Sequence, residues 1–354
     1  MYPNRFKWLL AVAQVGVLAT AGSASAAAEK VYVADEGANT VSIIDAASLK
    51  KIGSVAVGLG PHNVQVSPDG RWVWVTNNGE PGHVKENIRT EKMPPGAKSK
   101  AEHGSMAGAG AVWTIDIATA AVVAKVPVGM HPAHVVVAGD GRTAYITNGG
   151  DNTVSVVDTE AQRVVASIPV GASPHGIRIS PDGKQAWVAN LKDGTVSVID
   201  TESRKQLAQI AVGQGPAQVG FTPDGRFAFV SLSKENRVVV IDPVSRKLIR
   251  KITVGTVPIQ LFATPDSRFV LVANQGTQSM PGTTVSVIDV ARLKVVSTIK
   301  TGAGAHGVVV DREGRRAFVT NTYANTVSVI DIGERKVIAT VPVGRGPNGI
   351  SMVP

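Results

Sequence analysis

The chain has 354 residues, of which 44% are hydrophobic and 18% are charged, with a formal net charge of +9 and no cysteine. This apolar fraction excludes intrinsic disorder as the main state, and the lack of cysteine excludes disulfides, thiolate zinc sites, iron–sulfur clusters, a cysteine nucleophile and a lipoprotein anchor. The basic residues are dispersed without a long run, which is typical of a solvated surface and argues against a nucleic-acid partner.

The first 26 residues have the three parts of a secretory signal. Arg5 and Lys7 precede a mostly apolar run over residues 8–21, and a small-x-small motif ends at Ala26. The run is shorter than the roughly 20 residues that span a bilayer, which disfavours the alternative of a retained N-terminal anchor. We therefore predict cleavage near Ala26 and an exported mature chain, residues 27–354, without a transmembrane anchor.

After this segment the chain repeats one unit. The motif Thr-Val-Ser-Val-Ile-Asp and its variants recur at spacings of 71, 42, 42, 42, 47 and 42 residues. The basic period is therefore 42 residues, with a 29-residue insertion in the first interval and five extra residues in the fifth. A fixed period of this length indicates a repeat architecture. The motifs end at Asp45, Asp116, Asp158, Asp200, Asp242, Asp289 and Asp331.

Each unit predicts four short strands. A run such as residues 175–179 leads into a Ser-Pro-Asp-Gly turn such as 180–183, in which Pro sets φ and Gly accepts positive φ. An aromatic and β-branched run such as 144–148 follows, then the Val-Ser-Val-Ile-Asp segment, and a run such as 163–171 closes the unit. No segment of useful length in the mature chain has a helical period.

Seven such units predict an all-β, seven-bladed propeller with four antiparallel strands per blade, in which residues 27–354 form a single domain. The mature chain opens on the second strand of a unit, near residues 31–34, and ends on a first strand, near 348–353. We expect this C-terminal strand to be the inner strand of the N-terminal blade. Such closure would hide the two sheet edges that an open ring exposes.

Three strings carry a resemblance to a known family. Tyr-Ile-Thr-Asn at 145–148, Phe-Val-Thr-Asn at 318–321 and Trp-Val-Ala-Asn at 187–190 resemble the Tyr-Val-Thr-Asn motif of YVTN-type bacterial propellers, which include periplasmic YncE-like proteins. The resemblance covers nearly all of the mature chain and, with the signal, implies a periplasmic protein built of WD40-like repeats. The wider group is similar to haem d1, nitrous oxide reductase and lactonase-type propellers, so the fold leaves the activity open.

The repeated carboxylates are interpreted as scaffold. A residue found in every blade is one that the blade needs, and an Asp side chain readily bonds to the amides of the turn that follows it. The same interpretation covers the asparagines that follow the second strands. We therefore expect structural roles for Asp45, Asp116, Asp158, Asp200, Asp242, Asp289 and Asp331.

The histidines differ between blades and gather at one end. In an up-and-down blade, the connections that precede the first strand and follow the second strand lie on the same face. All seven histidines fall in or beside these connections, two of them in the long insertion, residues 79–110, which is rich in Gly, Pro, Lys and Glu and is expected to be a lid. The candidate ligand-binding or metal-ligating residues are His62, His134, His175, His306, His131, His83 and His103.

Two interpretations of these histidines remain open. Imidazole is the commonest ligand of zinc and copper in proteins, which makes copper or zinc the candidate metals. Alternatively, the repeats copied one residue, and each histidine bonds to the backbone of a neighbouring blade. No zinc-protease, P-loop, dinucleotide or nucleophile-elbow motif is present.

We expect an exported, monomeric binding or accessory protein that holds a small ligand, a metal or a partner protein on its histidine-rich face. The alternative is a metal- or cofactor-dependent oxidoreductase, or a lactonase-like enzyme, whose centre lies at the same channel mouth.

Overall fold

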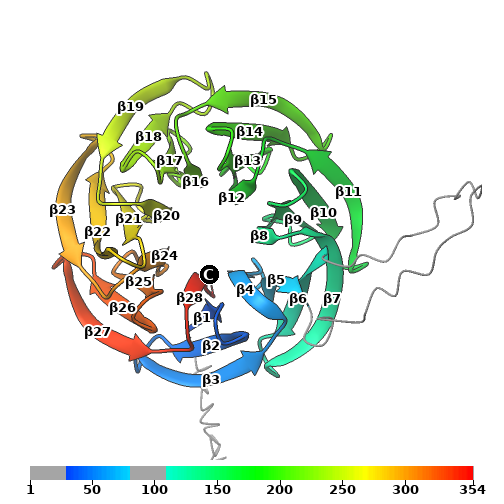
Figure 1. Cartoon of the computed structure of the whole chain (residues 1–354), viewed down its shortest axis with the longest axis horizontal. Coiled ribbons are helices and arrows are strands. Elements are labelled where there is room, and N and C mark those ends of the chain that lie inside the picture. Colours follow the sequence, from blue (N-terminus) through cyan, green and yellow to red (C-terminus); the bar gives the residue numbers. More distant parts are fainter. Residues whose placement is uncertain (1–28, 80–108, 354) are drawn as a thin grey trace, which may run out of the picture.

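The computed structural model describes residues 29–79 and 109–353. Within these ranges, 28 strands form seven four-stranded antiparallel sheets, arranged as blades around a common centre (Figure 1). The predicted seven-bladed propeller is confirmed. The predicted signal, residues 1–26, and all but the ends of the insertion, residues 79–110, lie outside the described residues. No helix within the described ranges is long and apolar enough to cross a membrane.

The two inner strands of each blade lie nearest the central channel. The innermost strands are β4 (Leu59–Val66), β8 (Pro132–Val137), β12 (Pro174–Ile179), β16 (Pro216–Phe221), β20 (Pro258–Ala263), β24 (Ala305–Val310) and β28 (Pro347–Met352). The second strands are β1 (Lys30–Asp35), β5 (Trp72–Gly79), β9 (Thr143–Asn148), β13 (Gln185–Asn190), β17 (Ala228–Leu232), β21 (Phe269–Gly276) and β25 (Arg316–Asn321).

The two outer strands complete each blade. The third strands are β2 (Thr40–Asp45), β6 (Ala109–Asp116), β10 (Thr153–Asp158), β14 (Thr195–Asp200), β18 (Arg237–Ile241), β22 (Pro281–Asp289) and β26 (Thr326–Asp331). The outermost strands are β3 (Lys50–Ala56), β7 (Ala121–Met130), β11 (Arg163–Pro169), β15 (Lys205–Ala211), β19 (Leu248–Thr253), β23 (Lys294–Lys300) and β27 (Lys336–Pro342).

The ring closes through the C-terminal strand, as predicted. β28 is the innermost strand of the sheet β28-β1-β2-β3 and pairs antiparallel with β1, with Val31 opposite Met352 and Val33 opposite Ile350. The first blade therefore contains both ends of the described chain. The facing edges of β1 and β28 are paired with each other, so neither is exposed.

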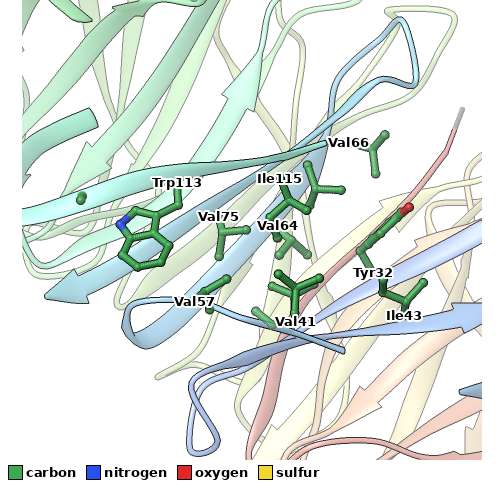
Figure 2. Packing of buried hydrophobic residues seen from close by; sticks show 13 residues of the cluster. Tyr32, Val41, Ile43, Val57, Val64, Val66, Val75, Trp113 and Ile115 are labelled. Atoms are coloured by element: carbon green, nitrogen blue, oxygen red, sulfur yellow. The ribbon is translucent and has the colours of Figure 1, made fainter. Parts of the chain in front are cut away.

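Burial follows the position of a strand in its blade. The second and third strands are buried on both faces because adjacent blades cover them. The outermost strands β11, β15 and β27 are exposed or half-buried except for one buried residue each. Apolar clusters join neighbouring blades: Tyr32 and Val41 of the first blade pack against Val64, Val75 and Trp113 of the next (Figure 2). At about 25 cal/mol per Å² of apolar surface, this packing between blades is the main stabilising term.

Turn chemistry sets the spacing between the first and second strands. In the Ser67–Gly70 turn, Ser67 Oγ donates a hydrogen bond to Asp69 and accepts one from the backbone N–H of Trp72, while Gly70 has a φ of 67°. Gly183 and Gly225 have the same positive φ in the equivalent turns, which only glycine adopts without strain.

Closure by β28 predicts a large loss of stability on truncation. A chain that ends at Gly346 loses all of β28 and exposes the edge of β1 together with the apolar face that Ile350 and Met352 cover. We expect the melting temperature to fall by more than 10 °C, or cooperative melting to be lost. A chain that ends at Val353 is the control and should melt like the full-length chain; equal melting temperatures for both truncations would refute the importance of closure.

Candidate functional site

A ring of polar residues lies near the start of the innermost strands. In each strand, one or both of the two residues after a proline, or after Ala305, are polar. All seven strands run in the same direction, so these residues lie at one end of the central channel. They are His62 and Asn63 in β4, His134 in β8, His175 in β12, Gln218 in β16, Gln260 in β20, His306 in β24 and Asn348 in β28.

Glycine makes room for this ring. In three of the four strands whose first residue after the proline or after Ala305 is polar, the next residue is glycine: Gly176, Gly307 and Gly349. A Cβ at Gly176 would lie 2.1 Å from Oε1 of Gln218, and a Cβ at Gly349 would lie 2.6 Å from Cα of Asn63. The glycines therefore allow residues from the next blade to lie directly against the backbone.

A hydroxyl on the second strand ties neighbouring inner strands together at the ring. Thr147 Oγ1 accepts a hydrogen bond from the backbone N–H of His134 in its own blade (2.9 Å) and donates one to the carbonyl of His175 in the next blade (2.6 Å). Each such hydroxyl fixes the separation of two inner strands where the ring residues begin. The same double contact is made by Thr76, Ser231 and Thr320.

In one of the three blades that lack this hydroxyl, a histidine makes the contact instead. Ala189 of β13 stands at the position of Thr147, and the carbonyl of Ala217, which a hydroxyl there would reach, instead accepts a hydrogen bond from His175 Nδ1 (2.9 Å). A carbonyl oxygen only accepts, so Nδ1 carries the proton. In the neutral ring, Nε2 of His175 is then left with its lone pair towards the channel.

The structure brings three of the candidate histidines together. The ring centroids are 4.8 Å apart for His134 and His175, 5.2 Å for His62 and His175, and 5.8 Å for His62 and His134. Nε2 of His62 lies 3.2 Å from Nε2 of His175, and each of the three side chains offers a nitrogen within 4.8 Å of the others. We call His62, His134 and His175 the histidine trio. His306 adjoins it, with its ring 6.3 Å from that of His62.

The trio is short of hydrogen-bond partners. Both ring nitrogens of His134 are buried with no partner among the described residues, and so is Nδ1 of His306. Leaving a buried polar group unpaired costs about 1–3 kcal/mol. Gln218 Nε2, Gln260 Nε2 and Asn348 Oδ1 in the same ring are also buried without a partner among the described residues. Unpaired polar atoms gathered around one channel mouth indicate a place for a ligand or for ordered water.

Burial keeps the channel histidines neutral. Burial, reinforced by the charge of neighbouring histidines, lowers the pKa of His175 to about 4 and that of His306 to about 3, and it holds the pKa of His134 well below its usual range. A neutral imidazole has a lone pair to offer, so these rings are available as ligands at neutral and mildly acidic pH.

A carboxylate stands beside the trio. Glu36 Oε2 lies 3.7 Å from Nδ1 of His62 and accepts a hydrogen bond from the Asn348 side chain. Burial alone would raise the pKa of Glu36, but the hydrogen bond and charge of His62 and the hydrogen bond from Asn348 bring it down to about 2. Glu36 is therefore ionised beside His62, and Nδ1 of His62 accepts a hydrogen bond from Asn348 Nδ2 (3.0 Å). We did not expect Glu36 from the sequence, although the predicted closure places its turn next to Asn348.

The other candidate histidines lie outside this cluster. His131 is exposed, has a positive φ of 50°, and lines a cavity of about 380 Å³ at the channel mouth together with His62, His175 and Lys192. His83 and His103 lie outside the described residues.

The repeated aspartates lie at the ends of the third strands, away from the ring. Asp45 accepts hydrogen bonds from the backbone N–H and the hydroxyl of Ser48, and the other six contact the turn after their strand in a similar way. The asparagines differ from expectation: Asn148 Nδ2 donates to Thr153 and Ser155 across the hairpin, not to the following turn. The Asn148 amide lies within the blade because the hydroxyls of the Thr-Val-Ser motif on the facing strand accept its hydrogen bonds.

Fold and site together define a β-propeller with a histidine-lined channel. Residues 96–225 and 216–353 match the family of YNCE-like beta-propellers. The chain belongs to this family, which confirms the resemblance drawn from the Tyr-Ile-Thr-Asn strings. The comparison with curated proteins gave no significant match.

Several solved structures share the fold. Hydrazine synthase of Kuenenia stuttgartiensis is 24% identical, with a TM-score of 0.66 over 82% of this chain and 88% of that chain. A functionally unknown protein from Desulfotomaculum acetoxidans is 17% identical (TM-score 0.71; 91% and 98% covered), and dihydro-heme d1 dehydrogenase NirN in complex with DHE is 16% identical (TM-score 0.62; 91% and 74% covered). At these identities the similarity shows the fold alone.

The low pKa values predict that the metal-free protein loses stability in acid. Unfolded histidine takes up a proton below about pH 6.5, whereas folded His175 does so only near pH 4 and His306 near pH 3. The unfolded state therefore binds more protons between pH 6.5 and 4, and the free energy of unfolding decreases as the pH falls through this window.

We expect His175→Gln and His306→Gln each to remove on the order of 2 kcal/mol of this pH dependence in denaturant titrations. His131→Gln should leave the profile unchanged; identical profiles for all three variants would contradict the prediction.

The hydroxyl that joins two blades predicts a cost for its removal. Thr147→Val keeps the side-chain shape but leaves the His134 N–H and the His175 carbonyl without their shared partner. We expect the free energy of unfolding to fall by about 2–4 kcal/mol, measured by urea titration. Thr119→Val, which removes a hydroxyl from an exposed turn, is the control and should cost less than about 1 kcal/mol. Equal effects of the two substitutions would show that Thr147 does not join the blades.

Proposed function

We propose that the histidine trio binds one zinc or copper ion, and that the protein is an exported metal-binding accessory propeller. The observation that carries the proposal is the convergence of His62, His134 and His175 from three consecutive blades on one buried point, with unpaired nitrogens between them. Imidazole nitrogen is a preferred ligand of both metals.

The spacing of the nitrogens suits such an ion. Two nitrogens each about 2.05 Å from a tetrahedral zinc ion are roughly 3.3 Å apart. The 3.2 Å between Nε2 of His62 and Nε2 of His175 agrees with this value. A small rotation of His134, whose ring nitrogens have no competing partner, would complete a three-histidine site.

The surroundings of the trio match those of metal-binding histidines. Such histidines usually direct their second nitrogen to a carboxylate or a backbone carbonyl, which orients the ring and makes it a better ligand. His175 does so through the carbonyl of Ala217. Nδ1 of His62 accepts a hydrogen bond from Asn348 Nδ2 (3.0 Å), and the carboxylate of Glu36 lies 3.7 Å from the same nitrogen. Both contacts leave Nε2 as the nitrogen that faces the channel.

An accessory role is favoured over catalysis because the described part of the site lacks a group suited to carry a proton at neutral pH. Among the described residues near the trio, Glu36 is the only carboxylate, and its low pKa makes it a poor proton carrier at neutral pH. The mouth above the trio, a cavity of about 380 Å³ edged by His131 and Lys192, gives a small ligand or a segment of a partner protein access to the ion. Three ligands leave a fourth position open, so a metal-dependent oxidoreductase or a lactonase-like hydrolase remains the alternative.

The test is the metal content of the mature chain purified from the periplasm without chelator, followed by titration with zinc and copper(II) after chelation. We expect one ion per chain, at least a hundredfold weaker binding in His134→Ala and in His175→Ala, and unchanged binding in His131→Ala. Binding that survives in both trio variants, or that is lost equally in His131→Ala, would refute the site.

A second variant tests the orientation of His175 without removing a ligand. Ala189→Ser supplies the hydroxyl that the equivalent Ser231 already provides in its own blade, and it would compete for the Ala217 carbonyl. We expect metal affinity to fall by about tenfold, at the low end of what loss of such orienting contacts costs. Turnover of a redox substrate or lactone by the loaded wild type, but not by His134→Ala, would establish the enzyme alternative.

A further inference from the structure

The other end of the channel holds a second, separate cavity. It has a volume of about 560 Å³ and opens among the turns between first and second strands, at Pro181 and Pro265, on the face opposite the histidine trio. Its walls are mainly apolar and include Phe262, Val309 and Met352. Small-molecule sites of proteins have this size and this mostly apolar lining with a few polar groups.

One cation stands in this apolar wall. Arg178 lies at a position of β12 whose equivalents in the other inner strands are uncharged: Gln65, Val136, Gly220, Phe262, Val309 and Ser351. Nη1 of Arg178 donates to the carbonyl of its neighbour Ile177 (3.0 Å), and none of the carboxylates in the described ranges forms an ion pair with it. Burial lowers the pKa of Arg178 to about 10, so the guanidinium is charged at neutral pH.

The single acidic group in the lining is already paired. Asp311 accepts a hydrogen bond from Arg316 Nε (3.1 Å) and two more from the backbone N–H groups of Arg315 and Arg316. The exposed Arg312 adds a further positive charge at the rim. The cavity is therefore apolar with a net positive character, and Arg178 has no counterion among residues 29–79 and 109–353.

We propose that this cavity binds a small organic anion, a carboxylate on an apolar aromatic or acyl body, with Arg178 as the partner of the carboxylate. The planar guanidinium has several N–H donors and one is used by Ile177, so it can still form two parallel hydrogen bonds to a carboxylate. The apolar body would lie against Phe262 and Val309. This site is independent of the metal proposed for the trio.

Two fluorescent probes of nearly the same shape test the proposal on the mature chain. 8-Anilinonaphthalene-1-sulfonate carries one negative charge, and its parent N-phenyl-1-naphthylamine carries none. We expect one anionic probe per chain, displaced by octanoate but not by octanol at the same concentration. Arg178→Gln should weaken the anionic probe at least tenfold and change the neutral probe less than twofold. Arg163→Gln, which removes an exposed arginine of β11 outside the lining, should change neither by more than twofold.

A second variant tests whether both probes bind in this cavity. Val309→Phe adds bulk to the apolar wall and should weaken both probes at least fivefold while the channel histidines are untouched. Melting curves of all variants are recorded alongside. Equal affinities of wild type and Arg178→Gln for the anionic probe, failure of octanoate to displace it, or undiminished binding in Val309→Phe would overturn the proposal.

Discussion

In four of the seven blades, one hydroxyl controls the geometry of the channel. A Thr or Ser at the end of the second strand joins two inner strands by accepting from one backbone and donating to the next. Apolar packing holds the blades together but is indifferent to small shifts, whereas a hydrogen bond has a narrow range of length and direction. The positions of the ring residues beside these hydroxyls therefore depend on them. Ala34, Ala189 and Ala273 stand at the same position in the other three blades, and at Ala189 the carbonyl is bonded by His175 instead.

Repetition explains why the fold could be predicted so fully and the site only in part. The 42-residue period and the turn residues predict the blades because each is encoded seven times. The order of strand motifs at the two ends of the repeat array predicts the pairing of β28 with β1. The gathering of histidines at one end follows from strand order. The carboxylate of Glu36 beside His62 and the bond of His175 to Ala217 occur once each, between residues far apart in sequence, so no period points to them.

The two ends of the channel show how a symmetric scaffold acquires different surfaces. At one end, polar residues occupy equivalent positions in all seven blades and differ only in kind. At the other, six of the seven equivalent residues carry no charge and Arg178 alone does. A single arginine in one copy is enough to place a charge there because the equivalent residues of the other copies are uncharged. The propeller thus separates stability, which depends on what the blades share, from recognition, which depends on how they differ.

Closure by β28 also brings together residues of the site that lie far apart in the sequence. Asn348 in β28 contacts Glu36, which follows β1, and His62 at the start of β4, so three distant residues meet at one side-chain amide. The pairing of β28 with β1 sets the position of that amide, because Asn348 belongs to the paired strand. A change that shifts the register between these two strands would therefore move the contact between Glu36 and His62, although neither residue is altered.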